Sequence, residues 1–173
     1  MCGVSRGPTC VYIWLIGEGE VRHPCVSLES VWCQVGVPDE YVLVVEATPA
    51  PVNTGWTFHV GLASGPSQFV FVVDAPGGIG LDRVDGKPFT ANESTRPGGR
   101  FTPGAPVTLE CTVRNAGVHV TMNGETIVDW RGERSRLSVV PIWPGRAAPG
   151  LFISTHGSYQ ISRIEVRPAG EKE

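Results

Sequence analysis

The segment 107–130, VTLECTVRNAGVHVTMNGETIVDW, constrains the fold of this chain more than any other stretch. Apolar and polar residues alternate over 107–114 and again over 118–122, which is the period-two pattern of half-buried strands. Asn123-Gly124 then supplies the two positive φ angles of a type I′ turn. The segment therefore predicts three consecutive antiparallel strands.

A two-residue turn also predicts which residues face each other across the last hairpin. The expected pairs are Met122 with Glu125, Thr121 with Thr126, and Val120 with Ile127. This register predicts an apolar face made of Val118, Val120, Met122 and Ile127, and an opposite face made of His119, Thr121, Thr126, Val128 and Trp130. The second face is then the surface on which we expect a ligand, if there is one.

Glycine and proline interrupt the rest of the chain too often for a helical core. Among 173 residues there are 22 glycines and 15 prolines, and the longest stretch without either is 25–35. About a dozen short strands separated by turn signals are typical of a sandwich or jelly roll. We therefore predict an all-β fold, a two-sheet antiparallel β-sandwich of the jelly-roll type, with a closed barrel as the alternative.

Single strands can be placed within this domain. The segment 41–48 carries apolar residues on both faces, which predicts a central strand covered on both sides. In the last strand, Ile161 and Ile164 share a face only if a bulge lies near Ser162-Arg163. We expect one sandwich domain over 11–168, a flexible N-terminal tail over 1–10 and a C-terminal tail over 169–173.

Charge and hydropathy narrow the possible partners. The formal net charge is −3, and the 14 basic residues are spread along the chain, so neither nucleic acid nor an anionic membrane is an expected partner. No apolar run approaches the roughly 20 residues of a membrane span. The run VYIWLI at 11–16 is short for a signal peptide. We therefore expect a cytoplasmic location if the chain is complete, and an extracytoplasmic one if it is an excised domain.

The five cysteines are an odd number, so at least one is unpaired. Cys2 and Cys10, and likewise Cys25 and Cys33, are spaced too widely for a zinc knuckle. We expect structural thiols, and the pairing of these four residues stays open. Cys111 holds an inward strand position and is expected in the core.

Four motifs occur in a characteristic order: PDEYVLVVEAT, then TFHVGLASGPSQFVFVVDAPGG followed by IGLDRVDGKPFTANES, then VTLECTVRNAGVHVTMNGETIVDWRGERSRLSV, then LFISTHGSYQISRIEVRP. Over 11–168 the chain thereby resembles the concanavalin A-like (LamG-like) domains of planctomycete bacteria, a group related to the 3-keto-disaccharide hydrolase domain. The resemblance implies a two-sheet jelly roll, often found as one module of a larger multidomain protein. It implies no particular activity, because this fold hosts lectins, glycosidases and interaction modules.

The sequence shows neither a pair of catalytic carboxylates nor a nucleophile beside a base. Retaining glycosidases need two carboxyl groups about 5–5.5 Å apart, whereas Glu18 and Glu20 flank a glycine in a turn. Ser64 is followed by Pro66 and a strand, not by the helix of a nucleophile elbow. Cys111 has no evident base beside it. We therefore lean towards a protein that is not an enzyme.

Oxygen-bearing side chains gather in and beside the loops between the two halves of the chain. They are Asp74, Asp82, Asp85, Asn92 and Glu93. Calcium takes six to eight such oxygen ligands, but the packed DxDxDG pattern of a dedicated calcium loop is missing. We expect no cofactor, with these side chains bracing the loops through hydrogen bonds and a calcium site as the alternative.

Carbohydrate binding would use exposed aromatic faces with polar side chains nearby. Trp130 is the first candidate, with His119 on the same predicted face and Arg131 next in sequence. Trp143 and His156 are further candidates in loops. We expect a non-catalytic module that binds a glycan or a protein surface. A divergent glycoside-cleaving enzyme of the 3-keto-disaccharide hydrolase type and a purely structural interaction domain are the alternatives.

Overall fold

The computed structural model describes residues 2–5, 11–15, 20–23, 30–33, 37–51, 57–98, 101–140 and 150–170. In the first four of these segments it describes strand backbones. Trp143, a candidate ligand-binding residue, lies outside the described residues. No helix among the described residues is long and apolar enough to cross a membrane.

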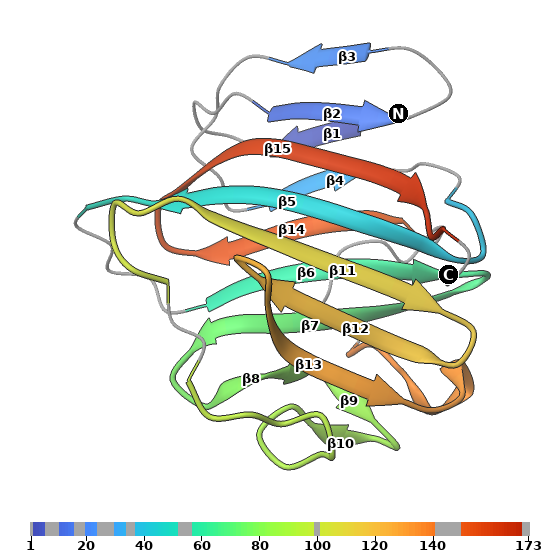
Figure 1. Cartoon of the computed structure of the whole chain (residues 1–173). Helices are drawn as coiled ribbons and strands as arrows, with labels where there is room; N and C mark the ends of the chain where they lie inside the picture. Colours follow the sequence, from blue (N-terminus) through green and yellow to red (C-terminus); the bar gives the residue numbers. More distant parts are fainter. Residues whose placement is uncertain are drawn as a thin grey trace.

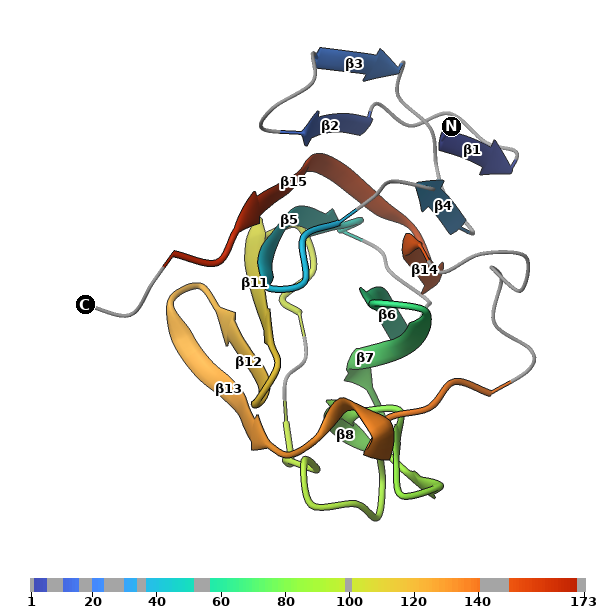
Figure 2. The ribbon, with the colours of Figure 1, turned by 90° about the vertical axis from the view of Figure 1, so that its right-hand side faces the viewer.

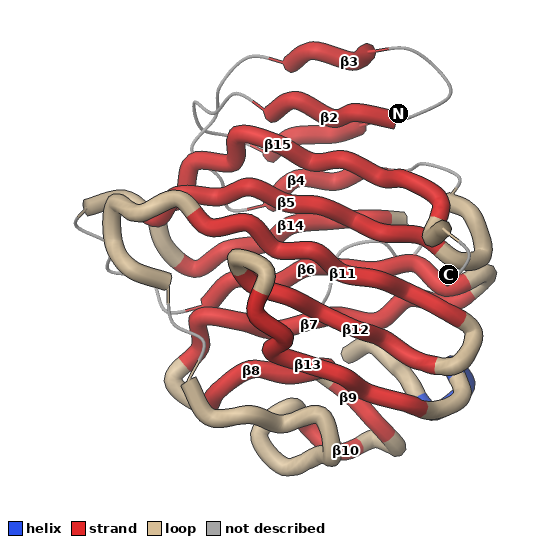
Figure 3. Tube along the Cα trace, viewed as in Figure 1, coloured by secondary structure: helices blue, strands red, loops and turns tan. Residues whose placement is uncertain are grey.

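Strands make up nearly all of the regular structure (Figure 3). They are β1 (Cys2–Ser5), β2 (Val11–Leu15), β3 (Glu20–His23), β4 (Ser30–Cys33), β5 (Tyr41–Pro49), β6 (Thr57–Ser64), β7 (Ser67–Ala75), β8 (Gly78–Leu81), β9 (Arg83–Val84), β10 (Lys87–Pro88), β11 (Val107–Arg114), β12 (Gly117–Met122), β13 (Glu125–Arg131), β14 (Leu151–His156) and β15 (Tyr159–Pro168). A 3-10 helix, η1, spans Arg134–Arg136.

These strands form two large sheets and one small one. The seven-stranded sheet has the order β13-β12-β11-β5-β15-β2-β3, the six-stranded sheet has the order β1-β4-β14-β6-β7-β8, and β9 pairs with β10. Figure 1 shows the seven-stranded sheet in front of the six-stranded one, and Figure 2 shows the two layers edge-on. The strand pairs are antiparallel except for β15 and β2. The predicted all-β sandwich is confirmed.

The core lies between the two large sheets. Phe58, Phe101 and Tyr159 form an aromatic group with ring centroids 5.2 to 6.0 Å apart. Side chains of this size contribute roughly 1.5–3 kcal/mol each when fully buried. Cys111 is 0% exposed, and burial raises the pKa of its thiol to about 12. Its predicted place in the core is confirmed, and the thiol stays protonated at neutral pH.

Several local predictions can be compared with the sheet pairings. β5 lies between β11 and β15, as expected of a central strand. The predicted bulge in the last strand is present, because the register of β15 against β5 shifts between Ile161 and Arg163. The N-terminal segment expected as a flexible tail contains one described strand. Cys2–Ser5 form β1, which pairs with β4 through backbone hydrogen bonds.

The hairpin after Asn123-Gly124 departs from the predicted register. The turn itself is as expected, with φ angles of 51° and 82°, and Met122 faces Glu125. The register then shifts between Val120 and Thr121, so that Val120 faces Val128 and not Ile127. The prediction was wrong from this point on, because a two-residue turn carries no information about a bulge farther along the strand.

The bulge reverses the faces of the second half of β13. Val128 and Trp130 are 1% and 4% exposed and belong to the core, whereas regular alternation from the turn predicts them on the outer face. Asp129 and Arg131 are exposed instead. The regular register would have buried these two charged side chains, and burying charges is costly. The bulge therefore lets the strand keep its apolar residues inside and its charges in solvent.

Candidate functional site

The outer face of the six-stranded sheet is covered by apolar side chains. Val70, Val72 and Phe152 are at most 2% exposed and form a second cluster there, against which Phe89 and Val139 pack. The Phe152 ring lies directly over Gly61, where a Cβ atom would lie 1.9 Å from the nearest ring carbon. Where the structure describes the side chains of this face, around β6, β7 and β14, these residues offer little open surface to a ligand.

The outer face of the seven-stranded sheet is hollowed by a groove of about 470 Å³ where β11, β12 and β13 lie side by side. We call this the outer groove. It is lined by Thr112, Arg114, Ala116, Gly117, Val118, His119, Asp129, Trp130 and Arg131. These residues come from the ends of β11, β12 and β13 and from the turn between the first two strands.

One row of side chains crosses the three strands within the outer groove. Thr112 pairs with His119, and His119 pairs with Asp129. His119 Nδ1 lies 3.3 Å from Asp129 Oδ1, and Arg131 Nη2 lies 3.7 Å from Asp129 Oδ2. Asp129 thus holds a basic side chain on each side. The Arg131 side chain is 81% exposed, so its guanidinium retains donors for a ligand.

A second row contains a glycine between two arginines. Arg114 pairs with Gly117, and Gly117 pairs with Arg131. A side chain cannot fill the middle position, because a Cβ on Gly117 would lie 2.2 Å from the Trp130 carbonyl oxygen. The close approach of these two strands therefore leaves a notch in the sheet surface, with an arginine on either side.

One wall of the outer groove is fixed by Arg114. Its Nη1 lies 3.3 Å from Glu40 Oε2, and its Nη2 donates to the Gly170 carbonyl at 2.9 Å. The Asn115 backbone N–H donates to Glu40 Oε1 at 2.7 Å. This N–H, together with Arg114, lowers the pKa of Glu40. The Ala169 N–H also donates to the Glu40 carbonyl at 3.1 Å, so Ala169 and Gly170, both expected in a tail, are hydrogen-bonded to the domain.

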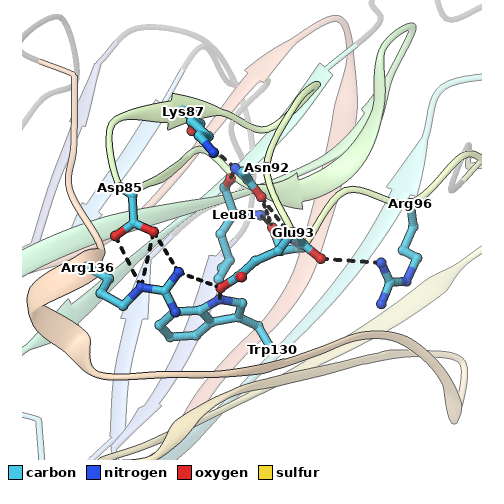
Figure 4. Close-up of polar contacts among 9 residues, drawn as sticks. Leu81, Asp85, Lys87, Asn92, Glu93, Arg96, Trp130 and Arg136 are labelled. Atoms are coloured by element: carbon cyan, nitrogen blue, oxygen red, sulfur yellow. Dashed lines mark hydrogen bonds and ion pairs between the residues drawn. The ribbon is translucent and has the colours of Figure 1, made fainter.

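Trp130 is buried in the core between the sheets, and polar contacts hold its indole ring (Figure 4). Its indole N–H donates to Glu93 Oε1 at 2.6 Å. Arg136 Nη2 lies 2.9 Å from the same oxygen and 2.6 Å from Asp85 Oδ2. The Arg136 guanidinium also lies 5.7 Å from the centre of the indole ring. We call these four residues the Trp130 clamp.

Two of the five candidate calcium ligands therefore do converge, but on a guanidinium. Asp85 and Glu93 are both ion-paired with Arg136. The hydrogen bonds from Arg136 lower the pKa of Asp85, and those to Asp85 raise the pKa of Arg136. The arginine thus supplies the positive charge between the two carboxylates and ties the loop after β9 to η1.

The other candidate calcium ligands have separate roles. Asp74 is buried and accepts hydrogen bonds from the Tyr159 hydroxyl and the Phe101 N–H. Asn92 Nδ2 donates to the Leu81 carbonyl at 2.8 Å, and Asn92 Oδ1 accepts from Ser94. Asp82 is also buried. Within the part of the chain that the structure describes, no three acidic, histidine or cysteine side chains form a metal-binding group.

His156 lies on the opposite sheet from the outer groove, at the exposed end of β14. Its ring is 6.1 Å from that of His59, measured between centroids. His59 is buried, and this burial, reinforced by His156, lowers the pKa of His59 to about 4. His156 is therefore not brought together with His119 and Arg131.

Sequence reasoning identified three residues of the outer groove, His119, Trp130 and Arg131, although the Trp130 side chain lies in the core. It missed three further side chains, those of Thr112, Arg114 and Asp129. Thr112, Arg114 and Asp129 were not candidates because their neighbours across the strands were unknown. One signal was available for Asp129. The segment DWR alternates charged, apolar and charged residues, which favours an inward Trp130 over an outward one.

No protein-family model matches the sequence, and no curated protein sequence matches it at a significant level. Several solved structures share the fold. The carbohydrate-binding module CBM66 from Bacillus subtilis is 7% identical, with a TM-score of 0.55 and coverage of 80% of each chain. A putative glycosyl hydrolase from Parabacteroides distasonis is 11% identical, with a TM-score of 0.51, over 82% of this chain and 76% of that one.

A third similar structure is the sialidase of Trypanosoma rangeli in complex with sialic acid, at 12% identity and a TM-score of 0.51. The match covers 98% of this chain but 28% of the sialidase chain. At these identities the likeness shows the fold alone. The chain thus has a β-sandwich fold shared with carbohydrate-binding and glycosyl hydrolase-like proteins, which agrees with a concanavalin A-like architecture.

Proposed function

We propose that this protein is a non-catalytic carbohydrate-binding module and that the outer groove is its binding site. The observation that carries the proposal is the convergence of Thr112, His119, Asp129 and Arg131 in one open groove. Their side chains combine a hydroxyl, an imidazole, a carboxylate and a guanidinium, which together can donate to and accept from the hydroxyl groups of a sugar.

The form of the groove also bears on the kind of recognition. Trp130, the one aromatic residue that borders it among the described residues, directs its ring into the core. A sugar would therefore be held by hydrogen bonds to the polar rows and not by stacking on an indole face. The similar fold of the carbohydrate-binding module CBM66 supports a module of this general kind.

A glycoside-cleaving activity of the 3-keto-disaccharide hydrolase type is the alternative that the resemblance in sequence motifs suggests. Among the described residues that line the outer groove, Asp129 is the single carboxylate. A retaining mechanism needs a second carboxyl group about 5–5.5 Å away. The described lining therefore supports binding more than cleavage. We extend the proposal to a planctomycete-type module that is part of a larger protein.

A glycan array with the purified protein tests the proposal. We expect the wild type to bind a subset of glycans, and we expect Asp129→Ala and Arg131→Ala to lose that binding. Arg96→Ala is the matched control, because Arg96 is exposed and lies outside the groove lining. A wild type that binds no glycan would contradict the proposal and would favour a protein surface as the partner. Unchanged binding by both groove variants would place the site elsewhere.

A further inference from the structure

The charge of the outer groove differs in sign from that of the whole chain. The chain carries a formal net charge of −3. The groove lining contains two arginines and a histidine but one carboxylate, Asp129. With His119 neutral, the lining carries two positive charges and one negative charge, and Glu40, which pairs with Arg114, lies beside it. An excess of positive charge among lining residues attracts ligands of the opposite sign.

The two arginines flank the same position of the central strand. Arg114 and Arg131 are both direct pairing partners of Gly117, one on each neighbouring strand. Because Gly117 has no side chain, the central strand places no side chain between Arg114 and Arg131. The Nη atoms of Arg114 contact Glu40 and the Gly170 carbonyl. Arg114 would have to turn from them to share a ligand with Arg131. Guanidinium groups bind planar oxyanions in bidentate geometry, and two of them on either side of a notch can hold one such anion.

The carboxylates near the notch already have partners, so their repulsion of an anion is reduced. Asp129 lies between His119 and Arg131. Glu40 accepts from Arg114 and from the Asn115 N–H. Arg134 adds a further guanidinium behind Arg114, since its Nε donates to the Arg114 carbonyl at 3.3 Å.

Of the two arginines, Arg131 has more hydrogen-bond donors that are available to a ligand. Its side chain is 81% exposed, and its contact with Asp129 is a long one of 3.7 Å. An exposed ion pair of this kind is worth little, so a ligand anion can take over the Arg131 donors at small cost. Arg114 is more constrained, since it also holds Glu40 and the Gly170 carbonyl.

From this geometry we infer that the outer groove selects acidic glycans, and that a carboxylate or sulfate group of the sugar binds between Arg114 and Arg131 over Gly117. The inference rests on the proposed function, because it names the class of glycan that the same groove accepts. Neutral hydroxyl groups of the sugar then contact Thr112, His119 and Asp129 in the adjoining row.

Two pairs of probes test this inference, each made of a charged and an uncharged form of the same sugar chain. The first pair is an oligogalacturonide and its fully methyl-esterified form, and the second is dextran sulfate and dextran. Affinities are measured by calorimetry at low and at high salt. We expect the wild type to bind at least one charged probe, to bind its uncharged counterpart at least about tenfold more weakly, and to lose affinity as salt screens the charges.

Substitutions show which residues bind the charged group of the probe. Arg131→Gln should weaken binding of the charged probe by about tenfold or more, since a charge-assisted contact is lost, while Arg96→Gln should leave the affinity unchanged. Arg114→Gln should act in the same direction. If Arg114→Gln does not fold because Glu40 loses its partner, the Arg131→Gln result decides.

The outcomes separate this inference from the proposed function. Equal affinity for the charged and uncharged members of each pair, or binding of neutral glycans alone, would overturn the inference and leave glycan binding intact. Binding of a charged probe that is unchanged in Arg131→Gln would overturn the assignment of the anion to this notch. A protein that binds none of the four probes and no glycan on an array would overturn both.

Discussion

The two large sheets enclose the same core, yet the side chains on their outer faces differ. The six-stranded sheet carries Val70, Val72 and Phe152, which are buried beneath further apolar side chains. The seven-stranded sheet carries His119, Asp129 and Arg131, which remain in contact with solvent.

The difference separates residues that hold the fold from residues that are free to bind. Side chains on the covered face have exchanged water for apolar neighbours, and this exchange is what stabilises a fold. Side chains in the outer groove have not, and their mutual contacts are long and exposed. Substitutions on the covered face should therefore act on stability, and substitutions in the outer groove should act on binding.

The largest effect is expected from Phe152→Ala on the covered face. Phe152 is 2% exposed, and its ring fills the space over Gly61. Its removal leaves a cavity, and we expect a loss of about 3–5 kcal/mol in the free energy of unfolding, measured by urea denaturation. Thr112→Ala on the open face is the control, with an expected change within about 0.5 kcal/mol. Equal losses of stability in the two variants would contradict the difference between the covered face and the open face.

The next effect is a pH dependence that arises from His59, also on the six-stranded sheet. Burial lowers the pKa of His59 from 6.5 to about 4 in the folded state. As the pH falls below 6.5, His59 becomes protonated in the unfolded chain but stays neutral in the folded chain. The free energy of unfolding therefore decreases. The contribution of neutral His59 is fully present above pH 6.5 and is lost as the pH falls through 4.

We expect this loss to amount to as much as about 3 kcal/mol. Urea denaturation at several pH values should show it in the wild type and show a flatter profile in His59→Gln. His119→Gln on the open face should retain the wild-type dependence. A His59→Gln variant with the full decrease would show that other groups cause it.

A smaller effect should follow from Glu93→Ala in the Trp130 clamp. The variant leaves the indole N–H of the buried Trp130 without its acceptor, which should cost about 1–2 kcal/mol. Glu93→Gln retains an acceptor oxygen and should recover part of this loss. Thermal denaturation measures the order of stability among the wild type, Glu93→Gln and Glu93→Ala. If Glu93→Ala is as stable as the wild type, the Trp130 clamp contributes nothing to the stability of the fold.

The sequence was sufficient for the fold class and for those strands whose apolar residues follow a clear pattern. The alternation in 107–114 and the apolar residues on both faces of 41–48 are local sequence patterns. Such patterns predict strands without knowledge of their partners. The positions of Asp129 and Trp130 could not be read from the Asn123-Gly124 turn, because the bulge beyond it depends on what the core can bury. The groove itself depends on pairing across three strands, which no local pattern encodes.

The smallest effect on stability is expected from Arg131→Ala. Arg131 is 81% exposed and makes one long ion pair, so the free energy of unfolding should stay within about 0.5 kcal/mol of the wild-type value. The same variant should lose glycan binding. A large loss of stability would show that Arg131 belongs to the structural residues and would remove the distinction between the two faces.

Nuclear magnetic resonance tests the central claim most directly, because it locates a bound glycan on the protein surface. The wild type is titrated with a glycan that it binds on the array, and the shifts of its backbone amide signals are followed. The account predicts that the perturbed amides cluster at Thr112, Gly117, His119, Asp129 and Arg131, and that the six-stranded sheet is unaffected. Perturbations confined to the six-stranded sheet, with those five amides unchanged, would contradict it.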